Sequence, residues 1–98
     1  QTLGLYPLQA LADAVGLPVS ELGKGAVSLS YNTRAKEDVA QVLAAAEAAG
    51  AEILKAASDV FWGGHHGYFR APDGQLWEVA HNPFSALSAE GAFRWNGY

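Results

Sequence analysis

The spacing of hydrophobic residues predicts two amphipathic helices. In each of them, apolar residues recur three and four positions apart, as along one face of a helix. The first stripe is Leu8, Leu11, Ala12 and Val15, and the second is Val39, Val42, Leu43 and Ala46. Gly16 and Gly50 are expected to end these helices, because glycine tolerates the left-handed conformation common at helix ends. Asn32 and Thr33 are expected to cap the start of the second helix.

Alternation of apolar and polar residues predicts strands around the helices. Residues 26–31 alternate, so Val27, Leu29 and Tyr31 should share one face and the intervening small residues the other. Residues 2–6 and 51–56 indicate two further short strands, and residues 66–71 and 75–81 indicate a hairpin. Over residues 26–81 the expected order is therefore strand, helix, strand, strand, strand, an α+β arrangement. Residues 16–25 and 58–64 are expected to be loops.

The turn between the last two strands predicts the register of that hairpin. In the run 71–75, APDGQ, Pro72 presets its own φ, Asp73 can bond nearby backbone, and Gly74 accepts a positive φ. A three-residue loop of this kind places the residues on either side of it opposite each other. The expected pairs are Arg70 with Leu76, Phe69 with Trp77, Tyr68 with Glu78, His66 with Ala80, and His65 with His81.

This register gives the hairpin two different faces, because side chains alternate along a strand. One face, with Phe69, Trp77 and Val79, is apolar and is expected to pack under a helix. The other face is mixed and holds Tyr68, Arg70, Leu76, Glu78 and His66. A polar cluster is unusual on a face that only packs, so we expect the functional surface there.

The hairpin run GG-HHGYF-R-APDG-QLWEVAHNP, within residues 61–83, resembles the last two strands of the vicinal oxygen chelate superfamily. That superfamily includes glyoxalase I, bleomycin-resistance proteins and extradiol dioxygenases. The resemblance implies a glyoxalase-like fold built from strand–helix–strand–strand–strand units, with a curved mixed sheet and helices on its convex face. It also implies one partial domain over residues 1–98: the end of a first unit and a link (1–25), a complete second unit (26–83) and a tail (84–98). A lone unit leaves one sheet face open, so we expect a homodimer or pairing with a missing first half.

By the same resemblance, Glu78 occupies the position of a metal ligand in metal-using members of the superfamily. The other ligand positions match poorly, because one falls at about Ala26 and another within residues 2–6, which contain no His or carboxylate. A divalent metal site needs several ligands. We therefore expect no cofactor, with a divalent metal on Glu78 as the less favoured possibility, and expect Glu78 to pair with Arg70 and to accept a hydrogen bond from Tyr68.

Three further observations concern possible chemistry. His66 beside Tyr68 and Glu78 is a combination suited to proton transfer. His65 and His81, on the opposite face, offer only two metal ligands. Trp62 is expected in a loop over the cavity mouth, where it can stack on a flat ligand.

In the tail, Phe93 and Trp95 alternate like a short strand that either patches an exposed edge or belongs to a loose terminus.

Composition narrows the class of function. The 98 residues carry six Lys and Arg against ten Asp and Glu, a net charge of −4 without a basic run, which argues against nucleic acid as a partner. There is no membrane-spanning apolar stretch, and the absence of cysteine excludes disulfides and fits a cytoplasmic protein. The sequence favours metal-independent binding of a small apolar or aromatic molecule, with Glu78, Tyr68, Arg70, His66 and Trp62 as contacts. The alternative is a metal-dependent lyase, isomerase or dioxygenase that uses Glu78 with ligands from a partner unit.

Overall fold

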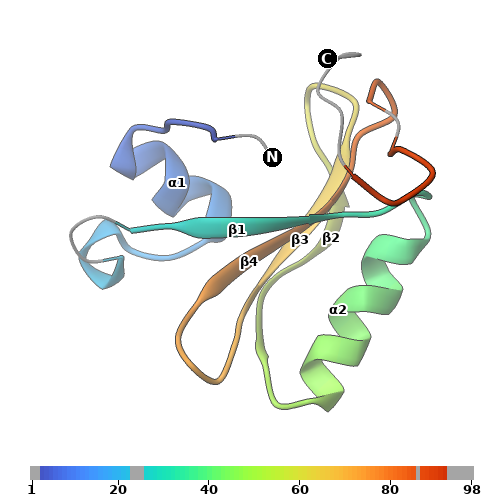
Figure 1. The fold of residues 1–98 in the computed structure, drawn as a ribbon. Coiled ribbons are helices and arrows are strands. Elements are labelled where there is room, and N and C mark those ends of the chain that lie inside the picture. Colours follow the sequence, from blue (N-terminus) through green and yellow to red (C-terminus); the bar gives the residue numbers. More distant parts are fainter. Residues whose placement is uncertain (1–2, 23–25, 86, 93–98) are drawn as a thin grey trace.

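The computed structural model describes residues 3–22, 26–85 and 87–92, which form two α-helices, a 3-10 turn and one four-stranded sheet (Figure 1). The elements in chain order are α1 (Leu8–Val15), the 3-10 turn η1 (Val19–Glu21), β1 (Ser28–Asn32), α2 (Asp38–Ala48), β2 (Glu52–Asp59), β3 (His65–Arg70) and β4 (Leu76–His81). The expected order from the first strand to the last is confirmed. Phe93 and Trp95, for which the sequence left a short strand or a loose terminus open, lie outside the described residues.

The sheet has the order β1-β4-β3-β2, with β1 parallel to β4 and the other neighbours antiparallel. The predicted hairpin register is confirmed at every pair, from His65 opposite His81 to Arg70 opposite Leu76. Its turn closes as the sequence predicts: Gly74 has a φ of +90°, and the Asp73 carboxylate accepts a hydrogen bond from the amide of Gln75 at 3.0 Å. Local turn chemistry is therefore sufficient to position Tyr68 beside Glu78.

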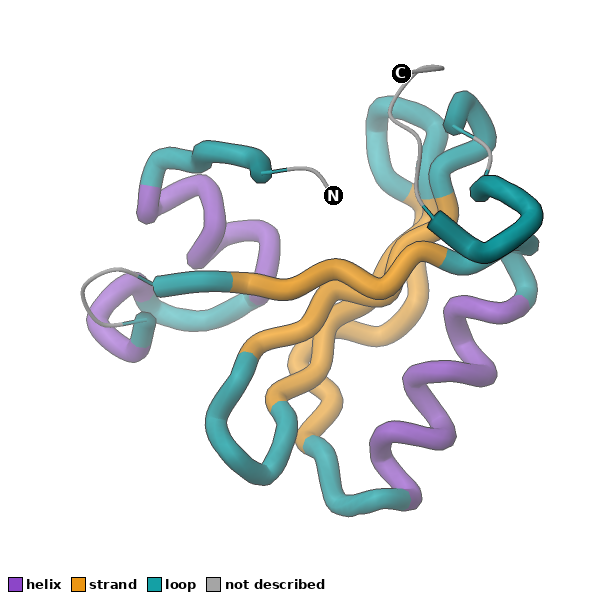
Figure 2. The backbone as a smooth tube through the Cα atoms, in the orientation of Figure 1, coloured by secondary structure: helices purple, strands orange, loops and turns teal. Residues whose placement is uncertain are grey.

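Helix α2 covers the apolar face of the sheet (Figures 1 and 2). Val39 and Leu43 of α2 pack with Val79 in a buried cluster that Phe69 and Ile53 border. This arrangement confirms that Phe69 and Val79 lie under a helix.

Helix α1 lies on the opposite face, where Leu11 and Val15 form a second buried cluster with Tyr68 and Leu76. The α+β class and the open mixed sheet are as expected. The expectation that α1 lies beside α2 on the convex side is wrong. Burial explains the difference, because Tyr68 and Leu76 offer α1 an apolar surface at one end of that face. The name "Glu78 face" is used below for the side of the sheet that bears Tyr68, Leu76 and Glu78.

Three local expectations also differ from the structure. Residues 3–6 are not a strand, and the expected strand's first residue lies outside the described chain. Asn32 and Thr33 do not cap α2, which begins at Asp38; the Thr33 hydroxyl instead donates to the Ala35 carbonyl at 2.8 Å. Strand β2 continues to Asp59, three residues beyond the expected end, and its pairing with β3 is interrupted by two irregularities.

Gly67 of β3 allows α2 and the neighbouring strand β2 to approach closely. A Cβ atom at this position would lie 2.5 Å from the Leu43 Cδ1 of α2 and 2.7 Å from the Lys55 carbonyl oxygen of β2. Both distances are shorter than real contacts, so any side chain here would push α2 or β2 away from the sheet.

Candidate functional site

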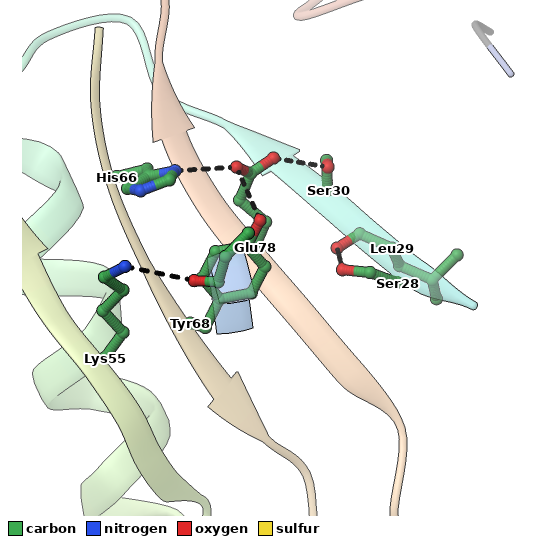
Figure 3. Close-up of polar contacts among 8 residues, drawn as sticks. Ser28, Leu29, Ser30, Lys55, His66, Tyr68 and Glu78 are labelled. Carbon is green, nitrogen blue, oxygen red and sulfur yellow. Dashed lines mark hydrogen bonds and ion pairs between the residues drawn. The ribbon is translucent and has the colours of Figure 1, made fainter. Parts of the chain in front are cut away.

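Glu78 lies at the centre of a polar cluster in the middle of the sheet (Figure 3). Its Oε2 accepts a hydrogen bond from His66 Nδ1 at 2.9 Å and another from the Tyr68 hydroxyl at 3.2 Å. Its Oε1 accepts one from the Ser30 hydroxyl at 2.9 Å. A carboxylate can only accept, so Nδ1 of His66 carries the proton that it shares with Glu78. Strands β3, β4 and β1 each supply part of this cluster.

The cluster is largely shielded from water but is not closed. The side chain of Glu78 is 21% exposed and that of His66 is 9% exposed. Burial raises the pKa of Glu78, but the hydrogen bonds from His66, Ser30 and Tyr68 outweigh it, so the pKa lies below its usual value. The pKa of Tyr68 is raised, first by burial and then by the neighbouring charge of Glu78. At neutral pH the cluster therefore holds an ionised glutamate and a neutral tyrosine that donates to it.

The expected contact between Tyr68 and Glu78 is confirmed, and His66 joins them. The expected pair between Arg70 and Glu78 is wrong. Arg70 Nε instead lies 3.4 Å from Glu52 Oε1, an ion pair without hydrogen-bond geometry. Arg70 is opposite Leu76 at the end of β3, and Glu52 is its direct neighbour across β2, so Glu52 is the nearer carboxylate.

Ser30 and Lys55 also belong to this face and were not predicted. Ser30 is paired with Glu78 in the parallel register of β1 and β4. Strand alternation places the small residues of β1 on one side, but only the long-range pairing shows that this side faces Glu78. Lys55 lies on β2 opposite Tyr68 (Figure 3). Its ammonium group donates to the Ala14 carbonyl of α1 at 3.3 Å.

Trp62 lies in the loop between β2 and β3, as expected, and is one of the residues that line the hollow beside the Glu78 face. Its ring covers Gly64, where a Cβ atom would come within 2.0 Å of the indole. His65 and His81 are opposite each other but have other partners: His65 Nδ1 lies 2.8 Å from Asp59 Oδ1, and His81 Nδ1 lies 3.3 Å from the Thr33 carbonyl oxygen.

The hollow beside the Glu78 face is broad and open. Its volume is about 2760 Å³, and it passes along both sides of the edge strand β1. Most of its border is apolar, and the polar side chains at its floor include Ser30, His66, Tyr68 and Glu78. Small-molecule sites typically enclose roughly 300–1,000 Å³. This hollow is larger, so a further wall would be needed to enclose a small ligand.

Comparison with known proteins identifies the family. The sequence profile of the Glyoxalase/Bleomycin resistance protein/Dioxygenase superfamily matches residues 10–79, more than half of the chain. The chain belongs to this superfamily. The match covers most of α1, the strands β1, β2 and β3, the part of β4 up to Val79, and the cluster around Glu78.

Solved structures of the superfamily support this assignment. A glyoxalase-related enzyme from Fulvimarina pelagi is 35% identical, with a TM-score of 0.70 over 90% of this chain. A glyoxalase/bleomycin resistance protein/dioxygenase family enzyme from Burkholderia phytofirmans PsJN shares the fold at 16% identity, with a TM-score of 0.55 over 74% of this chain. The chain spans 63% of the Fulvimarina structure and 58% of the Burkholderia structure. The comparison with curated proteins gave no match.

Superfamily membership raises the question of a metal, and the described residues of this chain do not form a complete site. Among them, no three His, Cys, Asp or Glu side chains are grouped to hold a metal ion. Glu78 and His66 are the two suitable groups on this face, and both oxygens of Glu78 already accept hydrogen bonds within the protein. A structural or catalytic metal usually takes three or four protein ligands.

No helix in the described parts of the chain is long and apolar enough to cross a membrane.

Proposed function

We propose that this superfamily member binds a small apolar or aromatic molecule in the hollow beside the Glu78 face, without a metal. The observation that carries the proposal is the Glu78 carboxylate itself, ionised and fixed by three donors at the floor of a largely apolar hollow. A carboxylate offers about four acceptor positions. Three are occupied, so Oε1 retains one for a donor on a ligand.

The bound molecule is therefore expected to carry a hydrogen-bond donor, and a positively charged one above all. Hydrogen bonds to charged groups contribute roughly 1.5–3 kcal/mol, which corresponds to about tenfold or more in affinity. Tyr68 and His66 hold the carboxylate in place, and Trp62, which also lines the hollow, offers a flat apolar surface to an aromatic ring. Arg70 is not part of this proposal, because it pairs with Glu52.

Three related ring compounds that differ in their donor group test the proposal. NMR titration should give 4-methylbenzylamine the highest affinity, 4-methylbenzyl alcohol an intermediate one, and 4-methylanisole, which has no donor, the lowest. The substitution Glu78→Gln should reduce the preference for the amine about tenfold, because it removes the negative charge. The control Glu47→Gln removes a charge from the exposed side of α2 and should leave the series unchanged. Equal affinity of wild-type protein for all three compounds would contradict the proposal.

The second candidate function is a metal-dependent lyase, isomerase or dioxygenase in which Glu78 ligates the metal with groups from a partner unit. One observation favours it: Glu78 and His66, two metal-ligating residue types, lie 2.9 Å apart on the open face. Elemental analysis of the purified protein discriminates the two functions. Stoichiometric divalent metal in the wild-type protein and in Glu47→Gln, lost in Glu78→Gln, would support this candidate over metal-independent binding.

We also propose that a second copy of the chain closes the hollow. Among the described residues the outer edge of β1 has no partner strand, and Leu29 and Tyr31 on that strand are 41% and 52% exposed. Exposed apolar side chains also gather before α1, at Leu3 and Leu5. Contiguous apolar surface beside an open sheet edge is typical of an interface.

A cytoplasmic location remains the expectation from the cysteine-free sequence.

A further inference from the structure

A β-bulge in β2 places a lysine on the Glu78 face. Ile53 is paired with Phe69, but the next pair joins Lys55 to Tyr68, so Leu54 and Lys55 together oppose one residue of β3. Regular alternation from Ile53 would direct Lys55 toward α2. Instead Leu54 packs beside Tyr68, and Lys55 reaches Ala14 of α1, which lies on the same face. Bulges commonly redirect a side chain in this way, close to functional sites.

With Lys55 on this face, one polar row crosses all four strands. Lys55 of β2 is paired with Tyr68 of β3, Tyr68 with Glu78 of β4, and Glu78 with Ser30 of β1. Figure 3 shows these four side chains on the same side of the sheet. Neighbouring strands are about 4.8 Å apart, so the backbones at Lys55 and Glu78 are roughly 10 Å apart. The row therefore has a cation near one end and an anion near the other.

The ammonium group of Lys55 has binding capacity left. In the described part of the chain, its one hydrogen bond goes to the Ala14 carbonyl at 3.3 Å, and no carboxylate there pairs with it. An ammonium group has three donors, so two remain. Lys55 also lines the hollow, together with Tyr68 and Glu78. Arg34 is the other described basic side chain along the hollow, and its guanidinium already donates to two carbonyl oxygens near the C-terminus.

We propose that the ligand of this hollow is bipolar, with an anionic group bound by Lys55 and a donor group bound by Glu78 at opposite ends of an apolar body. This proposal rests on the proposed function and specifies its ligand class. The apolar body lies in the hollow that both charged groups line. A carboxylate is the simplest anionic group that a lysine ammonium would bind, through a charge-assisted hydrogen bond.

The test compares 4-(aminomethyl)benzoate, which carries both charges at opposite ends of a ring, with 4-methylbenzylamine, which lacks the carboxylate. By NMR titration, the full chain should bind 4-(aminomethyl)benzoate about tenfold more tightly. Lys55→Met should abolish this difference and leave the affinity for 4-methylbenzylamine unchanged. Lys55→Arg should retain the preference for the bipolar compound. Lys36→Met, on a lysine that pairs with Asp59 away from the hollow, is the matched control and should retain it too.

Equal affinity of the wild-type chain for both compounds would overturn the bipolar ligand while leaving the proposed function intact. Weaker binding of both compounds by Lys55→Met, in equal measure, would show that Lys55 acts only by holding α1 and would also overturn it. The wild-type comparison and Lys55→Arg decide the question even where Lys55→Met fails to fold. Absence of binding by either compound would contradict the proposed function and this inference together.

Discussion

The positions of the polar residues on the Glu78 face follow from different kinds of sequence information. Glu78 and Tyr68 follow from local turn chemistry, which fixes the register of β3 and β4 and hence their contact. Ser30 and Lys55 depend on pairing between strands far apart in the sequence and on a bulge, neither of which leaves a local pattern. The prediction that Arg70 pairs with Glu78 was wrong for the same reason. Glu52 lies opposite Arg70 because of how β2 pairs with β3, which no local pattern shows.

The lowered pKa of Glu78 predicts how acid affects stability. The folded protein binds this proton less tightly than the unfolded chain, in which the pKa of a glutamate has its usual value of 4.5. The stability that Glu78 contributes is therefore complete above pH 4.5 and is lost as the pH falls through the lower, folded value. Urea unfolding at a series of pH values should show a smaller acid loss in Glu78→Gln than in wild type. Glu47→Gln should follow the wild type, and an identical slope in all three proteins would contradict the pKa shift.

At the scale of elements, the sequence predicts what neighbouring residues determine. The two helices, their glycine ends and the hairpin follow from periodicity and turn residues, and all are confirmed. The position of α1 on the Glu78 face depends instead on burial against Tyr68 and Leu76, a contact across more than 50 residues of sequence. The extension of β2 to Asp59 likewise depends on pairing with His65 of β3.

Gly67 offers a test of how closely α2, β2 and β3 pack. Gly67→Ala introduces a Cβ atom against Leu43 and the Lys55 carbonyl, so we expect a loss of roughly 1–3 kcal/mol in the free energy of unfolding. Gly4→Ala is the control, since nothing lies within 4 Å of a Cβ at that position. Chemical denaturation of both variants measures the difference. Wild-type stability in Gly67→Ala would show that the layers are looser than described.

For the whole molecule, the open hollow and the unpaired edge of β1 predict self-association. Light scattering should give the mass of two chains, because pairing would cover Leu29 and Tyr31 and provide a further wall to the hollow. Leu29→Glu places a charge in that interface and should shift the protein toward monomer. Ala44→Glu, on the exposed side of α2, should remain dimeric. A wild-type chain that stays monomeric at high concentration would contradict the homodimer.

The location of binding tests the account most directly. In an NMR titration of the wild-type chain with 4-methylbenzylamine, we predict the largest backbone shifts at Ser30, His66, Tyr68 and Glu78, which surround the proposed acceptor position. Val39 and Leu43 of α2, which pack on the other face of the sheet, should change little. Shifts concentrated beneath α2 with the Glu78 cluster unaffected would contradict the proposed site.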